Sequence, residues 1–252
     1  MEFNTFTLKQ KPNYVDLVDE LSQEAWPKFL LHGDATNWGL LLDTFANFQI
    51  LICDPSGDLM AFGHAVPLVW NGTPEDLPET IFEIISRACE AQDNGQAPNT
   101  VSALAAIVSK NYRRRGLSTQ LIQQMKVLAS KAECNALIAP VRPTLKERYP
   151  LISMERYIRW NDPNGESFDP WLRVHSRLGA EIMKVAQCTL KVEGSVSDWE
   201  GWTSMVFPDS GEYIVRGALQ PVLIDRELDY GCYKDPNVWM RHSVIPEGNH
   251  SG

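Results

Sequence analysis

The sequence lacks several patterns that would assign it to a common functional class. It has no Cys-x-x-Cys or His-x-x-x-His spacing, so we expect no metal site. It has neither the Gly-x-Gly-x-x-Gly fingerprint of dinucleotide-binding domains nor the Gly-Lys-Ser/Thr end of a P-loop. Its five cysteines, an odd number, favour free thiols in a reducing compartment over a disulfide framework.

The chain also lacks a long apolar run and an excess of basic residues. Nowhere do about eighteen apolar residues follow one another, and the N-terminal segment has no basic stretch before an apolar core. Acidic residues outnumber basic ones by 32 to 23, giving a formal net charge of −9 that opposes binding to nucleic acid and anionic membranes. We therefore expect a cytoplasmic protein without nucleic-acid or membrane partners.

What the chain does have is an ordinary globular composition. It contains 252 residues, of which 44% are hydrophobic, and this is enough for a sizeable core. No repeat, low-complexity linker or abrupt change of composition divides it, so we predict one domain over 1–252, with a core at about 3–192. The segment 194–252 has short apolar runs interrupted by Pro221 and Pro236, and we predict an irregular C-terminal extension there.

Two short apolar runs joined by a helical pattern form the centre of the predicted fold. Residues 101–108 are rich in small and β-branched side chains, which is typical of a buried strand. Apolar residues then recur at helical spacing from Leu117 to Leu128, and 135–141 is a second buried run. A strand, a helix and a strand in this order predict a βαβ unit and a partly parallel sheet, and therefore an α/β fold.

A basic turn connects the first of these strands to the helix. Arg113, Arg114 and Arg115 precede Gly116, where the helix exposes unpaired N–H groups, and such a place binds anions. Glycine allows the backbone to bend and to approach a phosphate closely. Ser118 can cap the first helical turn or donate its hydroxyl to a ligand. The alternative is a solvated basic turn without a ligand.

The segment 108–118, with the motif Arg-Arg-Arg-Gly-Leu-Ser at 113–118, resembles the pyrophosphate-binding signature of the GNAT superfamily of acyl-CoA-dependent N-acetyltransferases. That signature is Arg/Gln-x-x-Gly-x-Gly/Ala after a strand ending in valine. This chain departs from it at Lys110, where many members have proline, and at Ser118.

The resemblance implies a GNAT-like mixed sheet flanked by helices, and acetyl-CoA or another acyl-CoA as co-substrate. It also implies that the two central strands splay apart and leave a wedge in which the pantetheine arm pairs with the first strand. The implied cofactor-binding residues are Ala106, Ile107, Val108, Arg113, Arg114, Arg115, Gly116, Leu117 and Ser118.

The resemblance also implies a catalytic position. Members commonly carry a thiol-protonating tyrosine ahead of a glycine, and His175 occupies that place before Gly179. Histidine can donate a proton near neutral pH, so we predict that His175 is the general acid. The alternative is a partly buried histidine with a structural role.

The acceptor cleft of such enzymes is usually lined from the loop between the first two helices and from the segment after the second central strand. These places contain Trp26, His32, Asp34, Trp38, Arg142, Glu147 and Arg148, from which we select Trp38, Arg142 and Glu147 as substrate-binding residues. Arg142 either binds a substrate carboxylate or pairs with Glu147.

We therefore predict an acyltransferase that moves an acetyl or other short acyl group from CoA to an amine of a small molecule or a protein. One alternative keeps the fold and loads or decarboxylates an acyl group on a carrier protein. Another is a non-catalytic module that binds acyl-CoA or a partner, and it would tolerate His175→Phe without loss of function.

Overall fold

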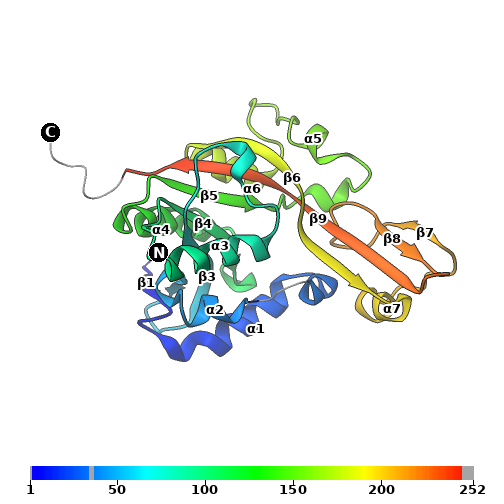
Figure 1. Cartoon of the computed structure of the whole chain (residues 1–252), viewed down its shortest axis with the longest axis horizontal. Helices are drawn as coiled ribbons and strands as arrows, with labels where there is room; N and C mark the ends of the chain where they lie inside the picture. The colour runs from blue at the N-terminus through cyan, green and yellow to red at the C-terminus, as the bar shows by residue number, and fades with distance from the viewer. Residues whose placement is uncertain (1, 34–36, 246–252) are drawn as a thin grey trace.

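The computed structural model describes residues 2–33 and 37–245, and within them one mixed sheet of nine strands forms the centre (Figure 1). The strands follow the order β1-β2-β3-β4-β5-β9-β8-β7, and β6 pairs with β9. The pair β4–β5 is parallel, whereas the other pairs are antiparallel. The predicted α/β class with a partly parallel sheet is confirmed. The strands are β1 (Asn4–Thr7), β2 (Ile50–Cys53), β3 (Leu59–Leu68), β4 (Thr100–Val108), β5 (Ala136–Val141), β6 (Ala180–Gly194), β7 (Gly211–Tyr213), β8 (Val222–Asp225) and β9 (Tyr230–Ser243).

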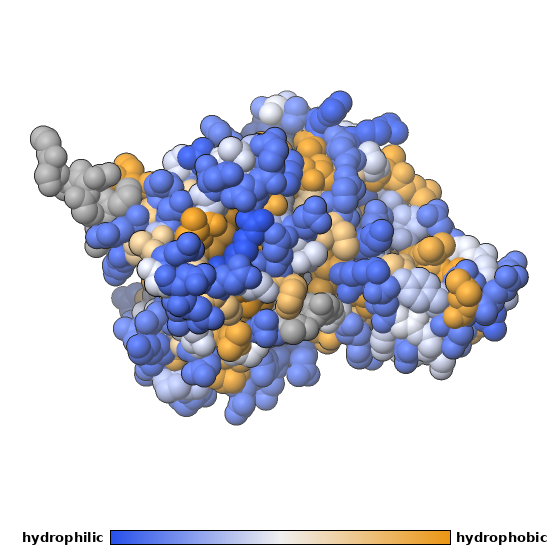
Figure 2. Space-filling model, viewed as in Figure 1, coloured by the Kyte–Doolittle hydropathy of each residue, from blue (hydrophilic) through white to orange (hydrophobic). Residues whose placement is uncertain are grey.

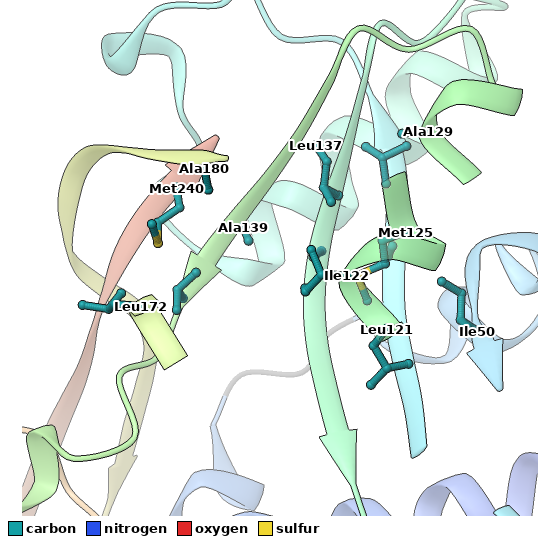
Figure 3. Packing of buried hydrophobic residues seen from close by; sticks show 14 of the residues in the cluster. Ile50, Leu121, Ile122, Met125, Ala129, Leu137, Ala139, Leu172, Ala180 and Met240 are labelled. Atoms are coloured by element: carbon teal, nitrogen blue, oxygen red, sulfur yellow. The ribbon is translucent and has the colours of Figure 1, made fainter. Parts of the chain in front are cut away.

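Helices cover both faces of this sheet. Figure 3 shows Leu121, Ile122 and Met125 of α4 packed toward the strands, in a cluster that includes Leu172 of α6. On the opposite face α3 packs over Leu104, while α1 and α2 lie over the neighbouring strands. The α-helices are α1 (Val15–Ala25), α2 (Gly39–Leu42), α3 (Ile81–Asp93), α4 (Leu117–Lys131), α5 (Met154–Tyr157), α6 (Pro170–Arg177) and α7 (Val196–Thr203).

The two central strands separate soon after they begin. Parallel pairing of β4 with β5 covers only Thr100 to Ser102 and their partners Ala136 to Ile138. Farther along, β4 stays on β3 as far as Val108, while β5 stays on β9 as far as Val141. Figure 3 shows the resulting divergence. The splay that the resemblance implied is therefore present.

The C-terminal segment differs from the predicted irregular extension. Strand β9 lies inside the sheet, antiparallel to β5 on one side and to β6 on the other. Pro236, which obscured this strand in the sequence, lies where the register between β6 and β9 shifts, and proline is tolerated at such irregularities. Strand β7 pairs with β8 at the far edge of the sheet.

The long β6–β9 pair extends beyond the rest of the sheet and carries α7, β7 and β8 at its far end (Figure 1). A separate apolar cluster stabilises this end, with Phe29 and Trp199 among its buried members. The surface in Figure 2 is mostly hydrophilic, with apolar residues scattered over it. All five cysteines are free thiols. No helix in the described part of the chain is both long enough and apolar enough to cross a membrane.

Candidate active site

A cavity of about 910 Å³ lies where β4 and β5 diverge. Ile122 of α4 and Val174 of α6 line it from one face of the sheet, and Trp38 and Leu104 line it from the other. The cavity therefore passes between the two strands. Its lining includes the predicted residues Ala106, Ile107, Val108, Arg113, Arg114, Gly116, Leu117, Ser118, His175, Trp38, Arg142 and Glu147.

Some of the other sequence candidates lie elsewhere. Arg115 is outside the lining, and its guanidinium lies 5.4 Å from the centre of the Tyr112 ring. His32 is also outside it and stacks on Trp202 with ring centres 4.4 Å apart. Trp26 lines the cavity and Arg148 does not. Asp34 falls outside the described residues.

The turn before α4 has the backbone conformation of an anion site. Arg114 and Gly116 both have left-handed backbones, with φ of 63° and 78°. Gly116 is the N-cap of α4 and no side chain caps the helix, so the first-turn N–H groups stay available, and Ser118 does not act as a cap. Nothing lies within 4 Å of where a Cβ on Gly116 would be. A ligand can therefore reach these N–H groups from the cavity.

This turn is anchored to the β2–β3 hairpin. The Ser109 N–H donates to the Met60 carbonyl at 2.9 Å, and the Tyr112 hydroxyl donates to an Asp54 carboxylate oxygen at 3.3 Å. Arg113 and Arg114 are exposed, and neither belongs to an ion pair among residues 2–33 and 37–245. Both positive charges are thus available to an anion bound at the start of α4.

The edge of β4 that faces β5 supplies the second part of the site. Beyond Ser102 this edge has no strand partner, although β3 continues to pair with the other edge. Backbone N–H and C=O groups there can bind an extended molecule that carries amides, as a further strand would. A pyrophosphate at the turn and an amide-containing arm along β4 together fit an acyl-CoA.

His175 is in the cavity wall, but its environment differs from the one predicted. The residue is buried, and its Nδ1 lies 2.9 Å from Nε2 of His242. Burial and, secondarily, the neighbouring His242 lower the pKa of His175 to about 3. The imidazole is therefore neutral near pH 7. The prediction of His175 as general acid relied on a histidine that is readily protonated near neutral pH, and this burial disfavours the protonated form.

Arg142 is held by the protein itself. Its Nε donates to both carboxylate oxygens of Asp235 at 3.0 Å, and its Nη2 donates to the Gly217 carbonyl at 2.7 Å. The Tyr233 hydroxyl donates to the same carboxylate at 2.6 Å. Arg142 therefore pairs with Asp235 and not with Glu147. These contacts occupy donors that a bidentate grip on a substrate carboxylate would need.

The two other predicted substrate-binding residues, Glu147 and Trp38, both line the cavity. Glu147 is exposed at its rim and forms no ion pair within the described part of the chain. Trp38 meets the ring of His64 edge-on, with ring centres 5.4 Å apart. An unpaired carboxylate in the lining of such a cavity is suited to a cationic ligand.

The lining residues that were missed from the sequence include His64, Asp235 and Asn237. His64 is the one ionisable side chain in the apolar strand β3, a signal that could have been followed. Asp235 and Asn237 belong to β9, which was not predicted as a strand. The Oδ1 of Asn237 is enclosed and has no hydrogen-bond partner among the described residues.

The divergent strands and the turn beside them fit a protein that binds an acyl-CoA. No family model matches the chain. It is 30% identical over 249 residues to the arginine N-acetyltransferase avaD of Aspergillus versicolor, an alignment that covers 87% of this chain and 85% of that protein. The chain therefore belongs to the GNAT superfamily of N-acetyltransferases, and it is an enzyme that transfers an acyl group to an amine.

Solved structures agree on the fold. The loading GNATL domain of CurA from Lyngbya majuscula matches with a TM-score of 0.64 at 14% identity, over 96% of this chain and 98% of that one. The GphF GNAT-like decarboxylase in complex with isobutyryl-CoA matches with a TM-score of 0.61 at 13% identity, over 96% and 99%. At such low identity these structures show the shared architecture.

Proposed function

We propose that this enzyme transfers an acetyl group from acetyl-CoA to an amine nitrogen of arginine or of a closely related guanidino compound. The observation that carries this proposal is the 30% identity to an arginine N-acetyltransferase over 87% of the chain. The acceptor part of the cavity supports it, because the carboxylate of Glu147 can accept two parallel hydrogen bonds from a guanidinium group.

In this proposal the residues of the cofactor end bind and orient acetyl-CoA, which supplies the activated acyl group. Backbone N–H groups from Gly116 to Ser118 hold the pyrophosphate, and the charges of Arg113 and Arg114 add attraction. The backbone of Ala106 to Val108 pairs with the pantetheine arm. Trp38 covers the apolar part of the acceptor.

Calorimetric titration with acetyl-CoA and with CoA tests the donor. We expect the wild type to bind both, and Arg113→Glu to bind them more weakly because the charge beside the pyrophosphate is reversed. Arg156→Glu is the matched control, since Arg156 is also exposed but does not line the cavity. Failure of the wild type to bind at high micromolar acetyl-CoA would contradict this choice of donor.

A free-thiol assay with acetyl-CoA tests the acceptor. We expect turnover of L-arginine and a lower kcat/KM for L-citrulline, which has a similar shape but no positive charge on its side chain. Glu147→Gln should raise the KM for arginine by roughly threefold to tenfold, with little effect on citrulline. Glu90→Gln, an exposed change outside the cavity, is the control. Binding of acetyl-CoA without turnover of arginine would overturn the acceptor and leave the donor standing, and a carrier protein would then be the next acceptor to assay.

A further inference from the structure

His64 lies on the acceptor side of the cavity, next to the strand edge that fits the acyl-CoA. It faces Ala105 across the β3–β4 pair, and residues directly opposite in an antiparallel pair project to the same face of the sheet. Both residues line the cavity. The imidazole is thus one strand away from the β4 edge and on the face that holds Trp38.

Gln49 determines which nitrogen of the His64 ring carries the proton. The Nε2 amide of Gln49 donates to the carbonyls of Phe45 and Ala65, at 2.8 and 2.9 Å. Its Oε1 must therefore be the atom that lies 2.8 Å from Nδ1 of His64. An amide oxygen can only accept, so Nδ1 carries the hydrogen and Nε2 has a free lone pair.

The Nε2 atom is accessible from the cavity. Among residues 2–33 and 37–245 no hydrogen bond to Nε2 is found, and Nε2 is not one of the enclosed atoms that lack a partner. Only 2% of His64 is exposed, so this nitrogen is shielded except toward the cavity that it lines. An unprotonated ring nitrogen in that position can accept a hydrogen bond from an amine.

The environment keeps His64 neutral. Burial lowers its pKa to about 4, and no charged side chain in the described part of the chain contributes to this shift. Other ionisable residues that line the same cavity include Asp19 of α1, Asp235, Arg142 and Glu147, and Asp235 and Arg142 are paired with each other. His64 therefore keeps its lone pair throughout the neutral pH range.

We propose that Nε2 of His64 is the base that accepts the proton of the acceptor amine during acyl transfer. The amine nitrogen forms a bond to the thioester carbon, and its proton passes to Nε2 directly or through one water. The carbon–sulfur bond then breaks, the thiolate leaves with the electron pair, and the proton on Nε2 passes to solvent or to that thiolate. Gln49 is the positioning residue that maintains the tautomer. This inference requires that the enzyme acylates an amine, but it does not require that the amine is arginine.

The first test compares His64→Asn with the wild type in the thiol assay with L-arginine. The side-chain amide of asparagine can still donate to Gln49, but it does not replace Nε2. We expect kcat to fall by about 10²- to 10⁴-fold, while the dissociation constant of CoA from calorimetry changes less than twofold. Phe62→Leu, on the same strand and face, controls for altered packing. A kcat within a few-fold of wild type would overturn the proposal.

A second measurement needs no variant and does not depend on turnover of arginine. Nitrogen-15 NMR of histidine-labelled wild type separates a protonated ring nitrogen from an unprotonated one. We expect Nδ1 of His64 to be protonated and Nε2 unprotonated from pH 6 to 8, with a shift of the Nε2 signal on addition of arginine to the CoA complex. A protonated Nε2, or an Nε2 signal that arginine leaves unchanged, would count against His64. If the wild type does not acetylate arginine, arginine is not the acceptor. The protonation of the two ring nitrogens, measured by NMR, would still show whether His64 can act as a base.

Discussion

The two ends of the cavity are built in different ways. The cofactor end is one continuous segment in which the left-handed residues Arg114 and Gly116 direct backbone N–H groups outward. The acceptor end brings together His64 of β3, Arg142 after β5 and Asp235 of β9, which are far apart in the sequence. The first end depends on backbone conformation, whereas the second depends on side chains that stabilise one another.

This difference predicts opposite sensitivities to mutation. The side chains of Arg113 and Arg114 at the cofactor end are exposed, so their loss should leave the fold intact and act only on ligand binding. Arg142 and Asp235 at the acceptor end are held in mutual contacts, so removal of one partner leaves the other without its counterpart.

Removal of the Asp235 carboxylate should have the largest effect. Asp235→Ala leaves Arg142 largely buried without its counterion and leaves the Tyr233 hydroxyl without an acceptor. We expect the free energy of unfolding to fall by about 3–5 kcal/mol, measured by urea denaturation. Arg113→Ala at the other end should change it by no more than about 0.5 kcal/mol. Equal effects of the two variants would abolish the contrast between the ends.

Acid should produce the next largest loss in the free energy of unfolding, through His175 in the cavity lining. His175 has a folded-state pKa of about 3, below its unfolded value of about 6.5, so the unfolded chain takes up the proton first. The contribution of this neutral ring is fully present above pH 6.5 and is lost as the pH falls toward 3. At pH 5 the loss amounts to about 2 kcal/mol.

Urea denaturation at a series of pH values measures this dependence. We expect His175→Phe to flatten the slope of the unfolding free energy between pH 6 and 4, because one titrating group is removed. Phe62→Leu is the control, since it should lower stability by the same amount at each pH. An unchanged slope in His175→Phe would show that the folded-state pKa of His175 lies close to its unfolded value, and its role as a general acid near neutral pH would then regain its basis.

The sequence predicted the cofactor end because all of its information is local. The apolar run of β4, the basic turn and the periodicity of α4 are contiguous, so pattern and position coincide. The acceptor end could not be predicted in the same way. Part of its lining comes from β9, and Pro236 together with buried polar residues such as Asp235 made this segment unlike a strand in the sequence. The hydrogen-bond partner of Asp235, Arg142, is distant in the sequence and lies close only in the folded chain.

For His175, the sequence pattern predicted the position of the residue but not its protonation state. The resemblance of the segment before Gly179 to the family's tyrosine position predicted His175 as a site residue, and the structure has it in the cavity lining. Its protonation depends on burial and on His242, a residue 67 positions away that approaches only because β9 joins the sheet. The charge state of a side chain depends on its tertiary surroundings, and a single sequence does not show which residues will surround it.

The smallest predicted effect is the most selective test of the cofactor end. Gly116 has a φ of 78°, and a Cβ added there would meet nothing within 4 Å, so Gly116→Ala introduces backbone strain without a steric clash. The left-handed conformation costs an alanine about 1–2 kcal/mol, which corresponds to roughly tenfold weaker CoA binding if the bound state needs that conformation. Calorimetry measures this change, and Gly201→Ala, in α7 with equally open surroundings and no left-handed backbone, should leave the affinity unaltered.

Asparagine tolerates the left-handed region, so Gly116→Asn should lose less affinity than Gly116→Ala. Wild-type affinity in Gly116→Ala would mean that binding does not require the loop to regain a conformation that alanine disfavours, and backbone conformation would then not distinguish the two ends of the cavity.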